Sequence, residues 1–200
     1  MIHELAQLLV DQIFDWGYLG IFIMMAIESS FVPFPSEIVL IPAGYLASQG
    51  DMSISLILLS ALGGSMIGAF INYFLALTLG RSFLKKYGKY IFINEKTLLK
   101  MEDFFEKHGH ISTFTGRLIP GIRQLISVPA GIAKMNILEF ALFTALGAFI
   151  WSCVLTFLGY FLGENQELIN SYLKQITIAT IAALVFIGFM YYKYKKREAK

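Results

Sequence analysis

The chain has 200 residues, 56% of them hydrophobic, and its mean hydropathy is +0.65. A soluble domain of this size does not use so much apolar surface, so the composition excludes an ordinary soluble protein and indicates an integral membrane protein. The net charge is only +2, and basic residues beside membrane spans are explained better by topology than by nucleic-acid binding.

The N-terminal residues 1–15 are predicted to form an amphipathic helix on the outer membrane surface, because apolar side chains recur on one side of it. Residues 1–10 do not form a basic n-region, so we do not expect a cleaved signal peptide.

Residues 16–80 form the first half of the predicted membrane domain. Its opening part contains two acids and three prolines, namely Glu28, Pro33, Pro35, Glu37 and Pro42. Backbone interrupted by proline cannot face lipid, because each unpaired N–H or C=O group is costly there. This part is therefore expected to line a buried or watery cavity.

Residues 81–110 are predicted to be cytoplasmic. The first 80 residues contain no Lys or Arg, whereas seven follow in this segment: Arg81, Lys85, Lys86, Lys89, Lys96, Lys100 and Lys107. A second basic group lies in the tail, 193–200. By the positive-inside rule both groups face the cytoplasm and 163–173 faces outward. Within the segment, 94–108 is expected to be a surface helix.

The largely apolar residues 111–134 are predicted not to cross the membrane. Full crossings are expected at 53–79, 137–162 and 174–192. These crossings place both basic groups inside only if 111–134 enters and leaves on the same side, as a re-entrant hairpin.

An internal repeat relates 16–80 to the second half, 111–163. The stretch from Pro33 to Pro42-Ala43-Gly44 matches Pro120 to Pro129-Ala130-Gly131 at the same spacing, and all five prolines lie in these segments. An odd number of crossings separates the copies, so they enter from opposite faces. The predicted fold is one all-α membrane domain, 1–200. It is an inverted repeat of two opposed re-entrant hairpins, with three full transmembrane helices and interfacial amphipathic helices.

The residues expected to shape the two hairpins are small or cyclic: Pro33, Pro35, Pro42, Gly44, Pro120, Gly121, Pro129 and Gly131. They are predicted to be structural. Asn72, in the first long span, is expected to bond a neighbouring helix rather than a ligand.

Four ionisable side chains make up the candidate site. Glu28 and Glu37 come from the first hairpin, and Arg117 and Arg123 come from the second. The hairpins should bring them together near the midplane, where ionisable groups are costly and are candidates for function. The planar fork of arginine suits phosphate or carboxylate, and a buried carboxylate can carry a proton. Alternatively, these charges are ion pairs that lock the hairpins together.

Two motifs resemble the DedA family, also called SNARE-associated or VTT-domain proteins. They are Glu28-Ser-Ser-Phe-Val-Pro-Phe-Pro-Ser-Glu37 and Phe114-Thr-Gly-Arg-Leu-Ile-Pro-Gly-Ile-Arg123, and the likeness covers about residues 10–165. Several members place a longer spacer, ending in Pro-Gly-Asp, between the two acids. In this chain the spacing is compact and ends in Pro-Ser-Glu. The resemblance implies a lipid translocase of the bacterial plasma membrane, with these glutamates and arginines as its essential charged residues.

The expected function is transport of a phosphate-bearing lipid, such as undecaprenyl phosphate or phosphatidylethanolamine, coupled to protons. The arginines would grip the anion and the glutamates would carry the protons; a homo-oligomer is left open. No cofactor or metal site is predicted, since the sequence offers neither a metal-binding constellation nor a Ser-His-Asp arrangement near Arg117. The alternatives are a membrane enzyme acting on lipid phosphates and a non-transporting scaffold.

Overall fold

The computed structural model describes residues 16–30, 35–80, 95–119 and 122–162, together with six single positions between 165 and 182. Every regular element in these ranges is a helix. In chain order they are a first helix Trp16–Glu28, α2 Glu37–Gln49, α3 Ile54–Leu75, the π-helical η1 Ala76–Gly80, α5 Glu95–Arg117, α6 Ser127–Ile132 and α7 Ile137–Leu162. The expectations for 1–15, for most of 174–192, for the basic tail, and for Pro33, Pro120 and Gly121 fall outside the described residues.

Among the described residues, two helices are long and apolar enough to cross a membrane: α3 with η1, over Ile54–Gly80, and α7. They contain 27 and 26 residues, which at 1.5 Å per residue gives about 40 Å, more than the ~30 Å of bilayer hydrocarbon. Large apolar side chains such as Leu59 and Leu138 are exposed on them. These helices match the predicted crossings at 53–79 and 137–162, and their exposed apolar surface suits contact with lipid.

The first helix and α2 form an antiparallel pair beside α3. Near the start of the pair, the Tyr18 hydroxyl accepts a hydrogen bond of 2.8 Å from the Ser53 amide, just before α3 begins. At the other end, Asn72 of α3 donates to the Ser29 carbonyl at 3.2 Å. The first helix therefore runs parallel to α3, and α2 returns. We call the described residues between the two helices of this pair, 29–30 and 35–36, the first turn.

The C-terminal end of α5 and the short α6 form a second antiparallel pair. Arg117 donates to Ser127 at 3.0 Å, where the pair is joined, and the Thr113 hydroxyl contacts Met135 sulfur at 3.4 Å, beyond the end of α6. The described residues between α5 and α6, 118–119 and 122–126, are called the second turn. The surface helix expected over 94–108 is the N-terminal part of α5, which continues without a break to Arg117.

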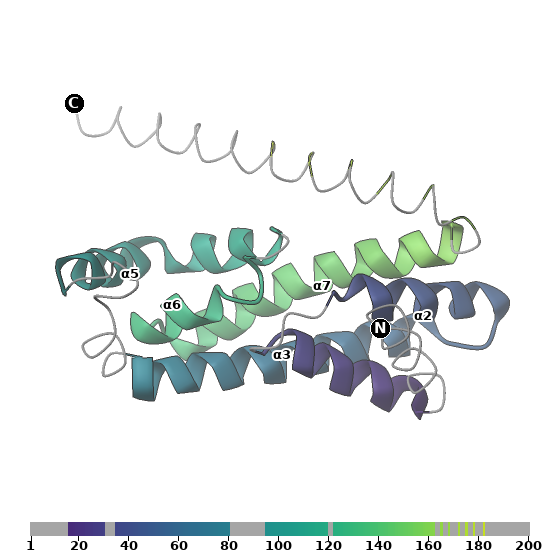
Figure 1. Cartoon of the computed structure of the whole chain (residues 1–200), viewed down its shortest axis with the longest axis horizontal. Helices are drawn as coiled ribbons and strands as arrows, with labels where there is room; N and C mark the ends of the chain where they lie inside the picture. Colours follow the sequence, from purple (N-terminus) through teal and green to yellow (C-terminus); the bar gives the residue numbers. More distant parts are fainter. Residues whose placement is uncertain are drawn as a thin grey trace, which may run out of the picture.

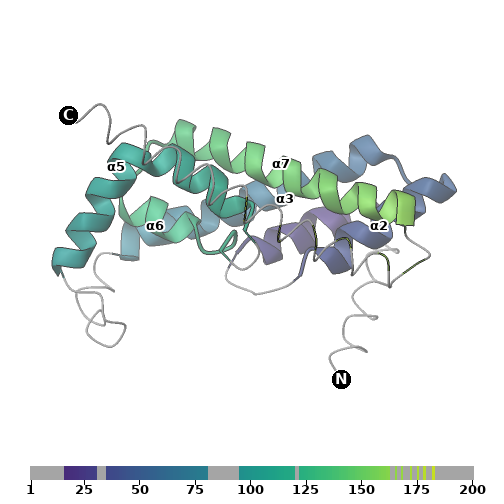
Figure 2. The same cartoon turned by 90° about the horizontal axis from the view of Figure 1, so that it is seen from above.

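The returning helix of each pair packs against the long helix of the other half (Figures 1 and 2). A Cβ on Gly44 of α2 would overlap the Thr156 carbonyl oxygen of α7, and a Cβ on Gly131 of α6 would overlap the Tyr73 carbonyl oxygen of α3. Both glycines end a Pro-Ala-Gly sequence. They permit the same kind of close backbone approach in each half.

A buried apolar cluster joins the first helix, α2, α3 and α7 around Ile21, Leu40, Ile57 and Leu155. A second cluster lies under α5 and α6 and includes Tyr73 and Phe140, whose rings stack with centroids 4.6 Å apart. The two pairs lie at opposite ends of the molecule in Figure 1, with their turns toward its middle. This arrangement brings the charged residues of the two turns together.

Candidate functional site

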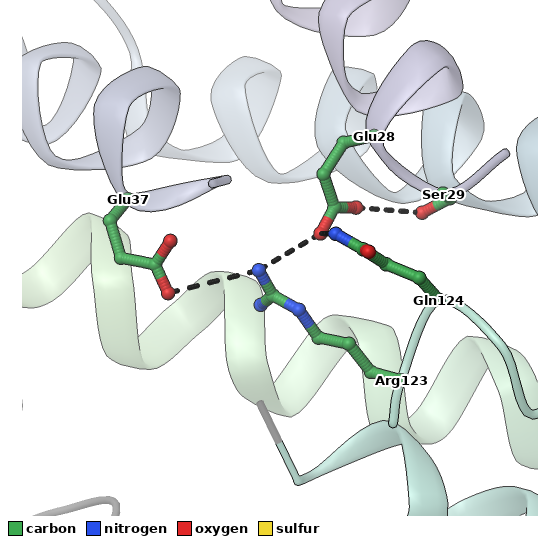
Figure 3. A network of polar contacts seen from close by, with 5 residues as sticks. All are labelled: Glu28, Ser29, Glu37, Arg123 and Gln124. Carbon is green, nitrogen blue, oxygen red and sulfur yellow. Dashed lines mark hydrogen bonds and ion pairs between the residues drawn. The ribbon is translucent and has the colours of Figure 1, made fainter. Parts of the chain in front are cut away.

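The two antiparallel pairs meet through a buried ion pair. Arg123 Nη2 lies 2.9 Å from Glu28 Oε1 and 3.7 Å from Glu37 Oε1. Figure 3 shows the guanidinium between the two carboxylates, which come from the end of the first helix and the start of α2. Glu28 is 3% exposed and Arg123 is 7% exposed, whereas Glu37 is partly buried. Three of the four predicted charged residues are therefore in one contact network.

Neutral neighbours complete the surroundings of Glu28. The Ser29 hydroxyl donates to Oε2 at 3.0 Å, and the Gln124 amide donates to Oε1 at 3.4 Å (Figure 3). Glu28 therefore has polar contacts at both carboxylate oxygens. The sequence analysis did not identify Ser29 or Gln124, although each is adjacent to a predicted site residue.

Arg117, the fourth predicted residue, forms no ion pair with Glu28 or Glu37, which both contact Arg123. It is 3% exposed at the end of α5, and its Nη2 donates to the Ser127 hydroxyl at 3.0 Å. Its Cβ packs against Gly147 of α7, where a glycine Cβ would approach to 2.6 Å. Within the described ranges, Arg117 has a hydroxyl as its partner rather than an acid, so the site contains one cation that is not held by a carboxylate.

Both arginines keep one unused donor. The Nε atoms of Arg117 and Arg123 are buried, and neither has a hydrogen-bond partner among the residues that the structure describes. Buried donors in proteins are nearly always paired, and arginine presents its donors as a fork that fits an oxyanion. The site therefore has the capacity to bind a group rich in acceptor oxygens.

Asn72 joins the two turns from the side of α3. Its Nδ2 donates to the Ser29 carbonyl at 3.2 Å and to the Gln124 carbonyl at 3.3 Å. Because Ser29 follows Glu28 and Gln124 follows Arg123, one fully buried amide fixes the backbone on both sides of the ion pair. The expectation that Asn72 bonds a neighbouring helix did not identify this bridge between turns.

Trp151 of α7 forms the wall behind Arg123, with the guanidinium carbon 5.2 Å from the ring centroid. A cation over an aromatic face is attracted by the ring quadrupole. Sequence reasoning missed Trp151, because a tryptophan in an apolar span is ordinarily packing. A sequence feature that points to Trp151 is its position one helical turn after Gly147, the residue on which Arg117 packs.

Two cavities lie toward opposite ends of α7. The larger, about 520 Å³, is lined by Phe105 and Glu106 of α5 and by Lys134, Asn136 and Glu139 around the start of α7. The smaller, about 300 Å³, has a lining that includes Tyr45 and Gln49 of α2 and Tyr160 of α7. The ion pair lies between them, near the middle of α7.

The described part of the chain contains no group of three or more His, Cys, Asp and Glu residues placed to hold a metal ion. Glu28 and Glu37 share an arginine instead.

Family models and protein sequences were compared with the whole chain, including the residues of this site. A family model described as the VTT domain matches residues 34–161. The chain is 38% identical to the uncharacterized membrane protein YkoX of Bacillus subtilis, over 100% of this chain and 88% of the relative. It is 36% identical to undecaprenyl phosphate transporter A of the same organism, over 96% of each chain.

A further relative is an alkaline phosphatase-like protein of Lactococcus lactis subsp. lactis, 34% identical over 96% of this chain and 92% of the relative. No solved structure matches.

Proposed function

The chain belongs to the VTT-domain (DedA) family of membrane proteins, and from that premise we propose that it carries a phosphate-bearing lipid between the leaflets of the bacterial plasma membrane. The buried contact between Arg123 and Glu28 is the observation on which this proposal depends. The name of the relative undecaprenyl phosphate transporter A supports a polyprenyl phosphate as the cargo.

The membrane arrangement in this proposal has two re-entrant hairpins. The first helix with α2 enters from one face, the end of α5 with α6 enters from the other, and both turns stop near the midplane. The reciprocal packing of Gly44 on α7 and Gly131 on α3 supports an inverted repeat. The positions of the residues that contact the turns also support it, since Trp151 lies near the middle of α7 and Asn72 lies inside the span Ile54–Gly80.

The chemistry of transport follows from competition for Arg123. A phosphate monoester offers several acceptor oxygens to the guanidinium, and it must displace the carboxylate of Glu28 to reach it. Protonation of Glu28 weakens its hold on Arg123, so a proton taken up by the glutamate favours binding of the phosphate. Arg117, which is bonded to Ser127 rather than to an acid, would add a second positive charge.

The lipid tail would stay in hydrocarbon while the headgroup passes through the polar region between the turns. The two cavities toward the ends of α7 suit entry and exit of the headgroup on opposite faces. A headgroup that leaves on the far side releases Arg123 to Glu28 again, which completes the cycle.

An enzyme acting on lipid phosphates is the second candidate, and the name alkaline phosphatase-like of the Lactococcus relative raises it. Proteoliposomes separate the two functions. Transport predicts that undecaprenyl phosphate moves between leaflets with unchanged mass and without release of inorganic phosphate. Release of phosphate at a rate matching the loss of the lipid would refute transport and favour the enzyme.

A further inference from the structure

Trp151 occupies a position between the charged site and the first pair of helices. It is 4% exposed, its ring lies under the Arg123 guanidinium, and it packs in one cluster with Val39 and Leu40 of α2. The ring therefore holds Arg123 from the side of α7, while Glu28 and Glu37 hold it from the other side.

The indole nitrogen of Trp151 has no acceptor. Nε1 is buried and lacks a hydrogen-bond partner among the described residues. Indole is a donor only, and its N–H usually finds a partner when it is buried. A phenylalanine or leucine would fill an apolar space without burying this donor, so packing alone gives no reason for the N–H.

Arg123, like Trp151, has a buried N–H donor without a hydrogen-bond partner in the part of the chain that the structure describes. The Arg123 Nε is also buried without a partner in the described ranges, and its guanidinium rests on the indole ring. These two donors belong to side chains in contact, with the guanidinium carbon 5.2 Å from the ring centroid, and both are suited to acceptor oxygens. The positive charge of Arg123 favours an anion. A cationic or purely apolar ligand would leave both donors unpaired.

We propose that Trp151 binds the phosphate of the lipid headgroup, with its ring holding Arg123 and its N–H donating to a phosphate oxygen. This inference rests on the proposed function, because it assigns a further ligand-binding residue to the same site. The indole N–H lies in the ring plane at its edge, so the phosphate it binds sits beside the ring while the guanidinium stays over the face.

The chain provides its own fluorescent reporter for this contact. It has two tryptophans, and the other, Trp16, is 54% exposed at the start of the first helix. Trp16→Phe leaves Trp151 as the sole tryptophan. Titration of this variant with farnesyl monophosphate should give a saturable change in emission, and farnesol should give none. An unchanged spectrum at concentrations that saturate binding in calorimetry would overturn the inference.

Calorimetry with farnesyl monophosphate on Trp151→Phe isolates the N–H, because phenylalanine retains a ring for Arg123. We expect binding about tenfold weaker than wild type, the size of one hydrogen bond to a charged group. Trp151→Leu, which also loses the ring, should bind more weakly still, and Trp16→Phe should match wild type.

Wild-type affinity in a folded Trp151→Phe variant would overturn the role of Trp151 and leave the proposed function intact. If wild-type protein does not bind the monophosphate, the proposed function fails, and the role of Trp151 fails with it. An unchanged emission of the native Trp151 would overturn the inference even if neither variant of that residue folds.

Discussion

Arg123 and Glu28 lie 95 positions apart in the chain, yet their side chains are joined by a buried contact of 2.9 Å. Glu28 ends the first helix of one antiparallel pair and Arg123 lies in the turn of the other pair, so this contact exists only when both halves are assembled. Glu37 shares the same guanidinium nitrogen at 3.7 Å. Any movement of the turns relative to each other must change this pair.

Loss of Arg123 should reveal how far the pair is structural. Arg123→Ala leaves Glu28 buried without its cation, which should lower the free energy of unfolding by about 3–5 kcal/mol. Combining it with Glu28→Gln removes the unpaired charge and should restore much of that loss. Thermal unfolding in detergent measures both. Equal stability of single and double variants would show that the two side chains do not depend on each other.

Asn72 should act as a support for the site. Asn72→Ala removes both bonds to the turns, and we expect a loss of about 2 kcal/mol in unfolding free energy, together with slower transport. Thr78→Ala is a suitable control, because that hydroxyl is exposed and bonds only carbonyls of its own helix, at Phe74 and Leu75. If Asn72→Ala protein has the same stability and transport rate as the control, Asn72 does not support the site.

Gly44→Ala tests the close packing of α2 on α7. The new Cβ would overlap the Thr156 carbonyl oxygen, which is backbone and cannot rotate away, so we expect destabilisation of about 3 kcal/mol or more. Gly63→Ala provides a matched control, since its nearest neighbours are atoms of the Phe22 ring, the nearest at 3.1 Å. Folded Gly44→Ala protein with an unchanged melting temperature would argue against this packing.

Membrane topology can be tested with single cysteines in a Cys153→Ala background, since Cys153 is the chain's one cysteine. Residues introduced within 163–173 should react with an impermeant maleimide in intact cells. Those within 193–200 should react only after permeabilisation. External labelling of the tail would mean that 111–134 spans the membrane, and the proposed inverted repeat would fail.

Sequence reasoning located the two long apolar helices to within one residue at each end, because length and hydrophobicity alone define them. It also anticipated that Glu28 and Arg123 meet, since ionisable groups in apolar surroundings need partners. It did not anticipate that Arg117 bonds Ser127 or that Asn72 bridges the turns. Those pairings depend on how each turn is folded, and no periodicity in the sequence encodes that geometry.

The contact between Trp151 and Arg123 could not be predicted from the sequence for a related reason. Its partner Arg123 lies 28 positions away on another element, and hydrophobicity places a tryptophan in the core whether or not its N–H is used. For the two glycines, the sequence predicted a structural role but did not predict which helix each one contacts. Gly44 and Gly131 were predicted from the repeat, but the helices that they contact belong to the opposite half.

Movement of undecaprenyl phosphate across proteoliposome membranes, followed over a range of pH, tests the central claim most directly. Wild-type protein should transport it with a rate that depends on pH. Arg123→Lys keeps the charge but loses the bidentate fork, and it should slow transport about tenfold or more while folding normally. Glu28→Gln cannot take up a proton or compete as an anion for Arg123, so its transport should vary less with pH than that of wild type, with Glu37 still beside the same guanidinium. Folded Arg123→Lys and Glu28→Gln proteins that transport at wild-type rates at every pH would contradict the account.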